Sequence, residues 1–484
     1  MKITINMNKI KVILLFVMSA LPGCCLLIGN IKLRLSLILT IGFLAIFLTY
    51  NYKQLLKEII ITFNNKMGKL LLVWLFWCFI SGMVACISGN CKAAQFIYYF
   101  IFHGILLVCF PYYFAFDTVQ KISIHKIIKY YFLFIMCIYA LGILNYIFMN
   151  TNISFLQTFF FKYVANARNL LSDIPANMVS LKRVHSTFVE PSYFANFICL
   201  NLPLLYEFSK SKFKIFKSKI LNLLSKKLLV ILAWLLLIST RSPIFLVIGI
   251  SLSAIYIIAN HNIKRIFSVF NITVFTFLTI ILITFAVIFH SDTNINVHET
   301  YLNRIINTIS SINSFENFAQ MENSLATRIV SSVNQFILGI HHPVFGVGYG
   351  NVAKLLQNQY MFSPLPLTYE ILESMAAGKE QANLIIFWTT IAEIGFVGLT
   401  LFYFFLINVI QKAKILIKYT VGNTQSFFKS LYWGVCFFTV VSVYDGEFST
   451  HILMIMGFIS GYYSKLIRNS KQQKLNDQKI STVD

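Results

Sequence analysis

Charged side chains are scarce in this sequence, and acidic ones are the scarcest. Lysine, arginine, aspartate and glutamate make up 12% of the 484 residues, whereas an ordinary soluble domain carries about 25%. The composition therefore excludes a soluble globular protein. Only 17 acidic residues stand against 40 basic ones, which gives a formal net charge of +23. Most basic residues lie beside the ends of apolar runs, so this charge predicts contact with anionic membrane lipids and no nucleic-acid partner.

Cysteine follows no pattern typical of a metal centre or a disulfide-rich domain. The nine cysteines are an odd number, and most of them fall in apolar runs, where a thiol acts as a small hydrophobic group. Cys86 and Cys91 lie close enough to the predicted outer face to pair. The sequence as a whole still predicts no disulfide framework and no metal site.

Long apolar runs, by contrast, recur along the whole chain. Hydrophobic residues make up 57% of it, and the mean hydropathy is +0.73. A run of about 20 apolar residues crosses the ~30 Å of a bilayer core. The sequence therefore predicts an all-α integral membrane protein, a single polytopic bundle of about twelve transmembrane helices over residues 1–484. The predicted spans are 10–29, 33–50, 70–88, 94–116, 129–149, 188–208, 228–240, 243–259, 266–290, 384–407, 429–443 and 451–465.

Basic residues fix the predicted orientation, because lysine and arginine near span ends favour the cytoplasmic side. With the N-terminus in the cytoplasm, 28 of the 40 basic residues fall in inner segments and 12 in outer ones. Both termini and the polar tail 466–484 are then cytoplasmic, and segments 150–187 and 291–383 lie outside. The N-terminus resembles a cleavable signal peptide, but its apolar run continues through Ile28, so we expect an uncleaved first span.

The outer segment 291–383, between the ninth and tenth spans, is too long for a plain connection and is expected to carry structure. Apolar residues recur in it at near-helical spacing, between residues 301 and 312 and again between 315 and 336. These patterns predict two amphipathic helices that lie over the outer mouth of the bundle.

Two charged residues at predicted outer span ends are candidates for chemistry. Arg241 separates two apolar runs, where its guanidinium could bind two diphosphate oxygens at once. The alternative is an arginine that caps a helical hairpin and reaches for water. Glu190 begins the span 188–208, where it could act as a general base or orient a sugar. Alternatively, it only stabilises a helix N-terminus that begins at Pro191.

Further candidates lie in and after the long outer loop. Residues 341–351 read HHPVFGVGYGN, without the strand and helix context of a dinucleotide site. Gly346 and Gly348 could let backbone amides approach an anion, or could simply form a tight turn. Two adjacent histidines cannot easily share a metal on one helix face, and His342 is kept as a candidate base. Glu393, inside the tenth span, could be catalytic or could bond to another helix.

Four short motifs, taken in order, resemble the bacterial O-antigen polymerase and ligase superfamily, and its Wzy-type polymerases in particular. The motifs are RVHSTFVEPSYFA at 183–195, STRS at 239–242, Arg328 with residues 343–351, and Asn383 with residues 393–398. Each motif alone is loose. Their order over roughly residues 180–400, with a long outer loop between the ninth and tenth spans, is typical of that family.

The resemblance implies a GT-C-like glycosyltransferase of the bacterial inner membrane that needs no metal and no other cofactor. Such an enzyme polymerises undecaprenyl-diphosphate-linked oligosaccharide repeat units for O-antigen or another surface polysaccharide. Its expected partners are that lipid-linked oligosaccharide, membrane lipids, a chain-length regulator and a flippase for lipid-linked sugars.

Carried over to this chain, the family's basic site residues fall on Arg241 and Arg328, and on Arg183. The expected catalytic residues are Glu190, Arg241, Arg328 and His342. The expected substrate-binding residues are Arg183, Tyr193, Gly346, Gly348, Asn351 and Asn383.

The chain departs from the family pattern at one position. Ligases of the superfamily carry a histidine just before the asparagine that opens the span after the long loop, and here Ala382 precedes Asn383. This departure favours a polymerase over a ligase-type transferase, and it leaves Glu190 and His342 as candidate bases. A transporter or flippase of lipid-linked sugars is the rival from another class, but the sequence has no inverted repeat typical of one.

Overall fold

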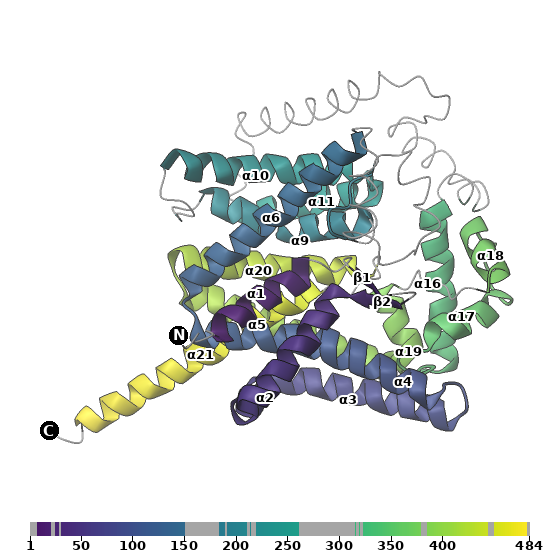
Figure 1. Ribbon diagram of the computed structural model, residues 1–484, viewed down its shortest axis with the longest axis horizontal. Helices are drawn as coiled ribbons and strands as arrows, with labels where there is room; N and C mark the ends of the chain where they lie inside the picture. The colour runs from purple at the N-terminus through teal and green to yellow at the C-terminus, as the bar shows by residue number, and fades with distance from the viewer. Residues whose placement is uncertain are drawn as a thin grey trace.

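The computed structural model describes residues 7–20, 25–28, 31–150, 183–188, 191–210, 213, 219–260, 315, 319, 323–378, 385–443 and 450–481. Within these residues the regular structure is helical, apart from one antiparallel hairpin in which β1 (Cys25–Ile28) pairs with β2 (Ile31–Arg34). Most of the helices pack side by side as a bundle (Figure 1).

Four helical segments of the described chain are long and apolar enough to cross a membrane. They are Lys66–Ile87, Ala93–Lys121, Ile124–Ile147 and Ile386–Tyr419. This finding confirms the prediction of a helical membrane protein, whereas the number of twelve spans and the GT-C likeness stay predictions. The corresponding elements are α3 (Lys66–Ile87), α4 (Ala93–Tyr99), the π-helical stretch η1 (Phe100–Cys109), α5 (Phe110–Lys121), α6 (Ile124–Asn150) and α19 (Ile386–Tyr419).

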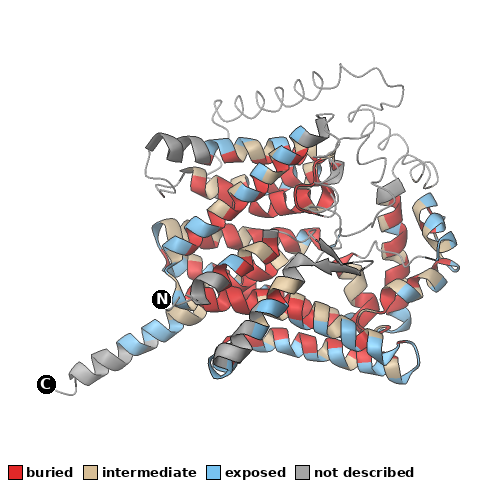
Figure 2. Cartoon of the chain, in the orientation of Figure 1, coloured by how far each residue is buried: buried red, intermediate tan, exposed pale blue. Residues whose placement is uncertain are grey.

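The other predicted spans overlap the remaining helices, except 266–290, which lies outside the described residues. These helices are α1 (Met7–Ala20), α2 (Leu35–Asn64), α9 (Pro191–Lys210), α10 (Lys219–Ser239), α11 (Pro243–Asn260), α20 (Gly422–Val441) and α21 (Thr450–Ser481). Buried residues face the contacts between helices, and exposed ones lie on the outer flanks (Figure 2).

The structure corrects the predicted first span and extends the last helix beyond its predicted span. The predicted first span, 10–29, is not one helix, because α1 ends at Ala20 and the chain enters β1 at Cys25. Pro22 and Gly23, which follow the helix end in the sequence, are both poor helix residues. The last helix, α21, does not stop at the predicted end of the final span, residue 465. It continues to Ser481 through most of the predicted tail and projects from the bundle (Figure 1).

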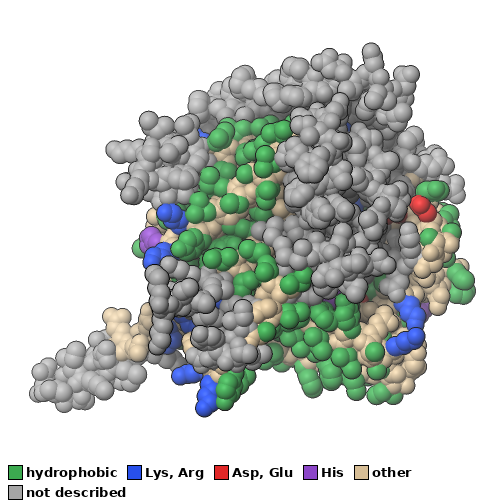
Figure 3. Space-filling model, viewed as in Figure 1, with side chains coloured by type: hydrophobic (Ala, Val, Ile, Leu, Met, Phe, Trp, Pro, Cys, Tyr) green, Lys and Arg blue, Asp and Glu red, His purple; other side chains and the backbone are tan. Residues whose placement is uncertain are grey.

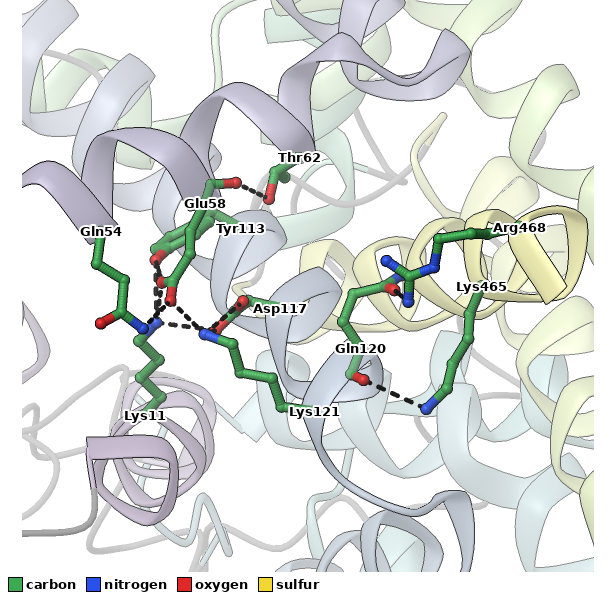
Figure 4. A network of polar contacts seen from close by, with 10 residues as sticks. All are labelled: Lys11, Gln54, Glu58, Thr62, Tyr113, Asp117, Gln120, Lys121, Lys465 and Arg468. Carbon is green, nitrogen blue, oxygen red and sulfur yellow. Dashed lines mark hydrogen bonds and ion pairs between the residues drawn. The ribbon is translucent and has the colours of Figure 1, made fainter. Parts of the chain in front are cut away.

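A buried polar network joins α1, α2 and α5 at one end of the bundle (Figure 4). Lys11 pairs with Glu58, and its Nζ lies 2.8 Å from Asp117 Oδ2. Lys121 pairs with the same two carboxylates, at 3.0 Å from Asp117. Burial alone would raise the pKa of Glu58, but hydrogen bonds from Lys11, Lys121 and Tyr113 outweigh it and lower that pKa to about 2. Lys11, Glu58 and Asp117 are buried, whereas the side chain of Lys121 is 26% exposed and reaches the two carboxylates from the edge of the network.

The helix α21 reaches the same end of the bundle. Lys465 Nζ donates to the carbonyl oxygens of Val119 at 3.0 Å and Gln120 at 3.3 Å, in the last turn of α5. Lysine and arginine side chains gather at the end where α21 projects, and hydrophobic side chains cover the flank (Figure 3). The start of α1 and the polar part of α21 thus share one end, as the prediction of two cytoplasmic termini requires. Which side of the membrane this end faces stays a prediction.

Candidate functional site

The predicted site residues that the structure describes lie toward the opposite end of the bundle. There α16 (Asn323–His341) runs across the bundle helices, with α17 (Val352–Tyr360) and α18 (Tyr369–Ala376) beside it (Figure 1). This arrangement fits the amphipathic pattern at 315–336. The first predicted amphipathic helix, at 301–312, lies outside the described residues, as do the predicted site residues Glu190 and Asn383.

The turn between α10 and α11 carries Arg241 and is built by local hydrogen bonds. The Arg241 amide donates to the carbonyl oxygen of Ile238 at 2.9 Å. Pro243 then begins α11, at a position where a helix does not need the missing N–H. Arg241 has a φ of +49°, a left-handed conformation that costs a non-glycine residue about 1–2 kcal/mol.

Arg183 binds this turn from the segment that precedes α9. Its Nε donates to the carbonyl oxygen of Thr240 at 3.1 Å, and its Nη2 donates to Ser242 Oγ at 3.3 Å. The Val184 amide adds a third bond, to the carbonyl oxygen of Ser239 at 3.0 Å. The structure therefore brings two of the three predicted arginines to one turn.

Arg241 stays protonated, and therefore positively charged, in this turn. Burial lowers the pKa of its guanidinium, and the nearby Tyr146 acts in the opposite direction. An arginine nevertheless stays protonated in proteins, because its ordinary pKa lies above 12. The turn thus presents a permanent, half-buried cation.

Asn145 of α6 fixes the residues that follow Arg183. Its side-chain carbonyl accepts the amides of His185 at 3.0 Å and Ser186 at 3.4 Å. Ser186 has a φ of +52°, and it and Arg241 are the non-glycine residues with positive φ in the described chain. Such strain is held by surrounding contacts and is concentrated at functional sites. Both strained residues lie in this one cluster, which we call the arginine cluster: residues 183–186 with the 239–242 turn.

His185 lies in the arginine cluster and is not among the site residues predicted from the sequence. Its side chain is 1% exposed. Burial lowers the pKa of the imidazole to about 4, against hydrogen bonds to the backbone of Phe188 and Ser186, and Arg183 contributes to the lowering. The ring is therefore neutral at pH 7 and a weak base, since an effective general base has a pKa near the working pH. The one signal in the sequence is its place between Arg183 and Glu190 in the first motif.

The other predicted residues are spread over this end of the molecule. Tyr193 is half-buried in the first turn of α9 and packs against the main core. Arg328 is half-buried on α16, the helix that crosses the bundle, and His342 is exposed in the turn that follows it. The structure thus joins Arg183 directly to the Arg241 turn, and places Arg328 and His342 on and beside the crossing helix.

The glycine-rich segment packs against a break in α19. The Val347 amide donates to the carbonyl oxygen of Ala392 at 2.7 Å, and the Gly348 amide donates to that of Glu393 at 2.9 Å. These carbonyls are available because Gly395 interrupts the helix, with φ +72° and ψ −178°.

Glu393 completes this contact with its side chain. The carboxylate accepts hydrogen bonds from the backbone amides of Gly350 and Val352, at the start of α17. A Cβ at Gly346 would lie 2.3 Å from the backbone carbon of Glu393, so only glycine allows this approach. These contacts support the tight turn at the glycines and the structural alternative for Glu393. Anion binding by Gly346 and Gly348 stays a prediction.

Asn351 links the glycine-rich segment to the connection between α3 and α4. The side chain is buried, and its Nδ2 donates to the carbonyl oxygens of Asn90 and Val347, each at 3.0 Å. The amide therefore holds the start of α17 against the connection at the C-terminal end of α3. A contact of Asn351 with substrate stays a prediction.

Within the described ranges, no three His, Cys, Asp or Glu side chains gather closely enough to hold a metal ion. Guanidinium groups at a membrane edge can bind phosphate oxygens in pairs and stabilise negative charge on a leaving group.

No protein-family model matches this chain, and no curated protein matches its sequence. The functional argument consequently rests on the chain's own residues and their geometry.

Proposed function

We propose that this protein is a membrane glycosyltransferase that polymerises polyprenyl-diphosphate-linked oligosaccharide repeat units at the outer face of the bacterial inner membrane. The observation that carries the proposal is the bonding of Arg183 to Thr240 and Ser242, on either side of Arg241. This bonding brings Arg183 to the turn that carries Arg241, between α10 and α11. In the proposed orientation, a lipid headgroup can reach this turn.

The chemistry follows from the groups in the arginine cluster. A sugar on a lipid diphosphate has a leaving group whose negative charge grows as the bond to the anomeric carbon breaks. Arg183 and Arg241 bind and stabilise that diphosphate. The acceptor hydroxyl forms the new glycosidic bond and gives up its proton to a base, for which the predicted candidates are Glu190 and His342.

The helices α16, α17 and α18 would support polymerisation by keeping water away from the site. Because α16 crosses the bundle end and α17 and α18 pack beside it, they can limit the entry of water (Figure 1). Exclusion of water favours transfer of the glycan to a hydroxyl over its hydrolysis. Arg328, on α16, would contribute a further cation from this cover.

Reconstitution of the purified protein with an undecaprenyl-diphosphate-linked repeat unit tests the proposal. We expect a ladder of polymers that remain on lipid diphosphate. A ligase-type transferase would form product only when a second, non-diphosphate acceptor is added. A transporter would move the lipid-linked unit between leaflets and form no glycosidic bond. Either of the last two results would refute the polymerase assignment.

A further inference from the structure

Two cysteines stand beside the contact of Asn351 with the outer end of α3, and the proposed chemistry does not use them. Cys86 lies in the last turn of α3, and Cys91 lies in the short connection to α4. Asn90, one residue before Cys91, supplies the carbonyl oxygen that Asn351 binds at 3.0 Å. The pair therefore sits at the point where the first outer connection supports the glycine-rich segment.

The backbone brings the two cysteines together. The amides of Asn90 and Cys91 both donate to the carbonyl oxygen of Ala85, at 2.9 and 3.2 Å. That oxygen belongs to the peptide bond that joins Ala85 to Cys86. From standard bond lengths, the α-carbons of Cys86 and Cys91 are consequently no more than about 7 Å apart. Disulfides join α-carbons that are about 4.4–6.8 Å apart, so no large movement of the backbone is needed.

The side chains meet as well. The Cys86 and Cys91 thiols are close enough for Cys86 to influence the pKa of Cys91, and the Cys91 thiol donates to the carbonyl oxygen of Lys92 at 3.5 Å. Both belong to one small apolar cluster with Ala85, Phe96 and Phe100. Cys86 is half-exposed and Cys91 is buried. Burial raises the pKa of the Cys91 thiol, and the neighbouring Cys86 acts in the same direction, so Cys86 is the better placed of the two to react first.

We propose that Cys86 and Cys91 form an intramolecular disulfide when the protein resides in its membrane. The predicted orientation places this connection outside the cytoplasm, where disulfides form and persist. The oxidant is a disulfide-bearing thiol oxidoreductase of that compartment. This inference depends on the orientation and not on the glycosyltransferase activity.

The disulfide forms by thiol–disulfide exchange with the oxidant. Cys86 loses its proton and attacks one sulfur of the oxidant, whose second sulfur leaves as a thiolate. Cys91 then loses its proton and attacks Cys86, which releases the oxidant. One S–S bond forms here and one is broken in the oxidant, which gains two electrons and the two protons. The new bond ties the end of α3 to the residues that receive Asn351, and so steadies the start of α17.

Mass spectrometry of the full-length protein tests the proposal. Cells are quenched in acid, the protein is denatured and alkylated without reductant, and its peptides are analysed with and without later reduction. We expect Cys86 and Cys91 to be unalkylated and linked, in a product lighter by two hydrogens, and to accept alkyl groups only after reduction. The Cys78→Ser variant, which changes a buried thiol of the same helix, leaves this result unchanged. In Cys86→Ser, Cys91 becomes alkylated without reduction.

Alkylation of both thiols in the unreduced wild-type protein overturns the proposal. Linkage of either thiol to another cysteine instead overturns it equally. Polymerase activity is measured on the same preparation. A missing disulfide then refutes only the disulfide proposal, and missing activity refutes only the proposed function.

Discussion

The guanidinium Nε of Arg183 lies 3.1 Å from the carbonyl oxygen of Thr240. This bond connects the segment before α9 to the turn after α10, so the backbone next to Arg241 is held by the side chain of another arginine. The position of the Arg183 side chain and the backbone conformation of the Arg241 turn are thereby linked. The arginine cluster consequently behaves as one unit, and its residues should not be interchangeable with simple cations.

Substitutions at Arg241 distinguish the role of its charge from the role of its left-handed backbone conformation. Glycine adopts a φ near +49° without the cost that a side chain incurs. We therefore expect Arg241→Gly to equal or exceed the wild type in thermal stability but to lose polymer formation. Arg241→Lys should restore activity poorly, because a point charge does not reproduce the guanidinium fork. Polymer length distributions on lipid-linked substrate provide the measurement, and a normal ladder from Arg241→Gly would contradict the diphosphate role.

Replacement of Glu190 distinguishes a base from a residue at a helix start. Removal of a general base typically slows turnover by ~10²–10⁴-fold, whereas loss of a favourable charge near a helix N-terminus costs only ~0.3–1 kcal/mol. We expect Glu190→Gln to reach normal membrane abundance and to polymerise far more slowly. Turnover within about threefold of the wild type would move the base role to His342, whose glutamine variant serves as the matched comparison.

The buried His185 gives the protein a specific sensitivity to acid. Its pKa falls from 6.5 to about 4 on folding, so the unfolded chain takes up this proton more readily than the folded one. The stabilising effect is complete above pH 6.5 and is lost as the pH falls toward 4, up to about 3 kcal/mol. The melting temperature in detergent should therefore drop over this range, and His185→Gln should flatten the dependence. An unchanged pH profile in the variant would refute the assignment.

Cysteine labelling tests the orientation. Lys354 in α17 and Lys57 in α2 are both exposed, and they are predicted to lie on opposite sides of the membrane. In a background whose other accessible cysteines are replaced by serine, a membrane-impermeant maleimide should label Lys354→Cys in intact cells and Lys57→Cys only after permeabilisation. The reverse pattern would place the arginine cluster in the cytoplasm and remove the basis of the mechanism.

The inner network predicts a large difference between two neighbouring lysines. Lys11→Met leaves Glu58 and Asp117 buried with Lys121 as the remaining lysine of the network, and loss of one partner of a buried ion pair costs about 3–5 kcal/mol. Lys57→Met, at an exposed position next to Glu58, should change stability little. Thermal unfolding in detergent compares the two. Equal melting temperatures would show that the network contributes nothing to stability. A double variant, Lys11→Met with Glu58→Gln, that melts at a higher temperature than Lys11→Met would confirm the contribution of the network.

The sequence predicts those features that depend on local pattern. Hydropathy predicts the helical membrane class, the 3.6-residue period predicts α16, and a cation followed by Pro243 between apolar runs predicts the turn at Arg241. Contacts between distant segments are not predictable in this way, because periodicity indicates which face of a helix is buried but not what packs against it. The pairing of Lys11 with Asp117, the burial of His185 and the break at Gly395 all depend on such packing.

The pairing of Lys11 with Asp117 has a consequence for the order in which the bundle assembles. The two residues are 106 positions apart, so at a synthesis rate of about 5–20 residues per second the ribosome makes the acid roughly 5–20 seconds after the base. Glu58, only 47 positions after Lys11, is made sooner and supplies the first countercharge, whereas the second carboxylate of the network arrives with Asp117. The two lysines and the two carboxylates can therefore all pair only after α5 has been delivered to the membrane.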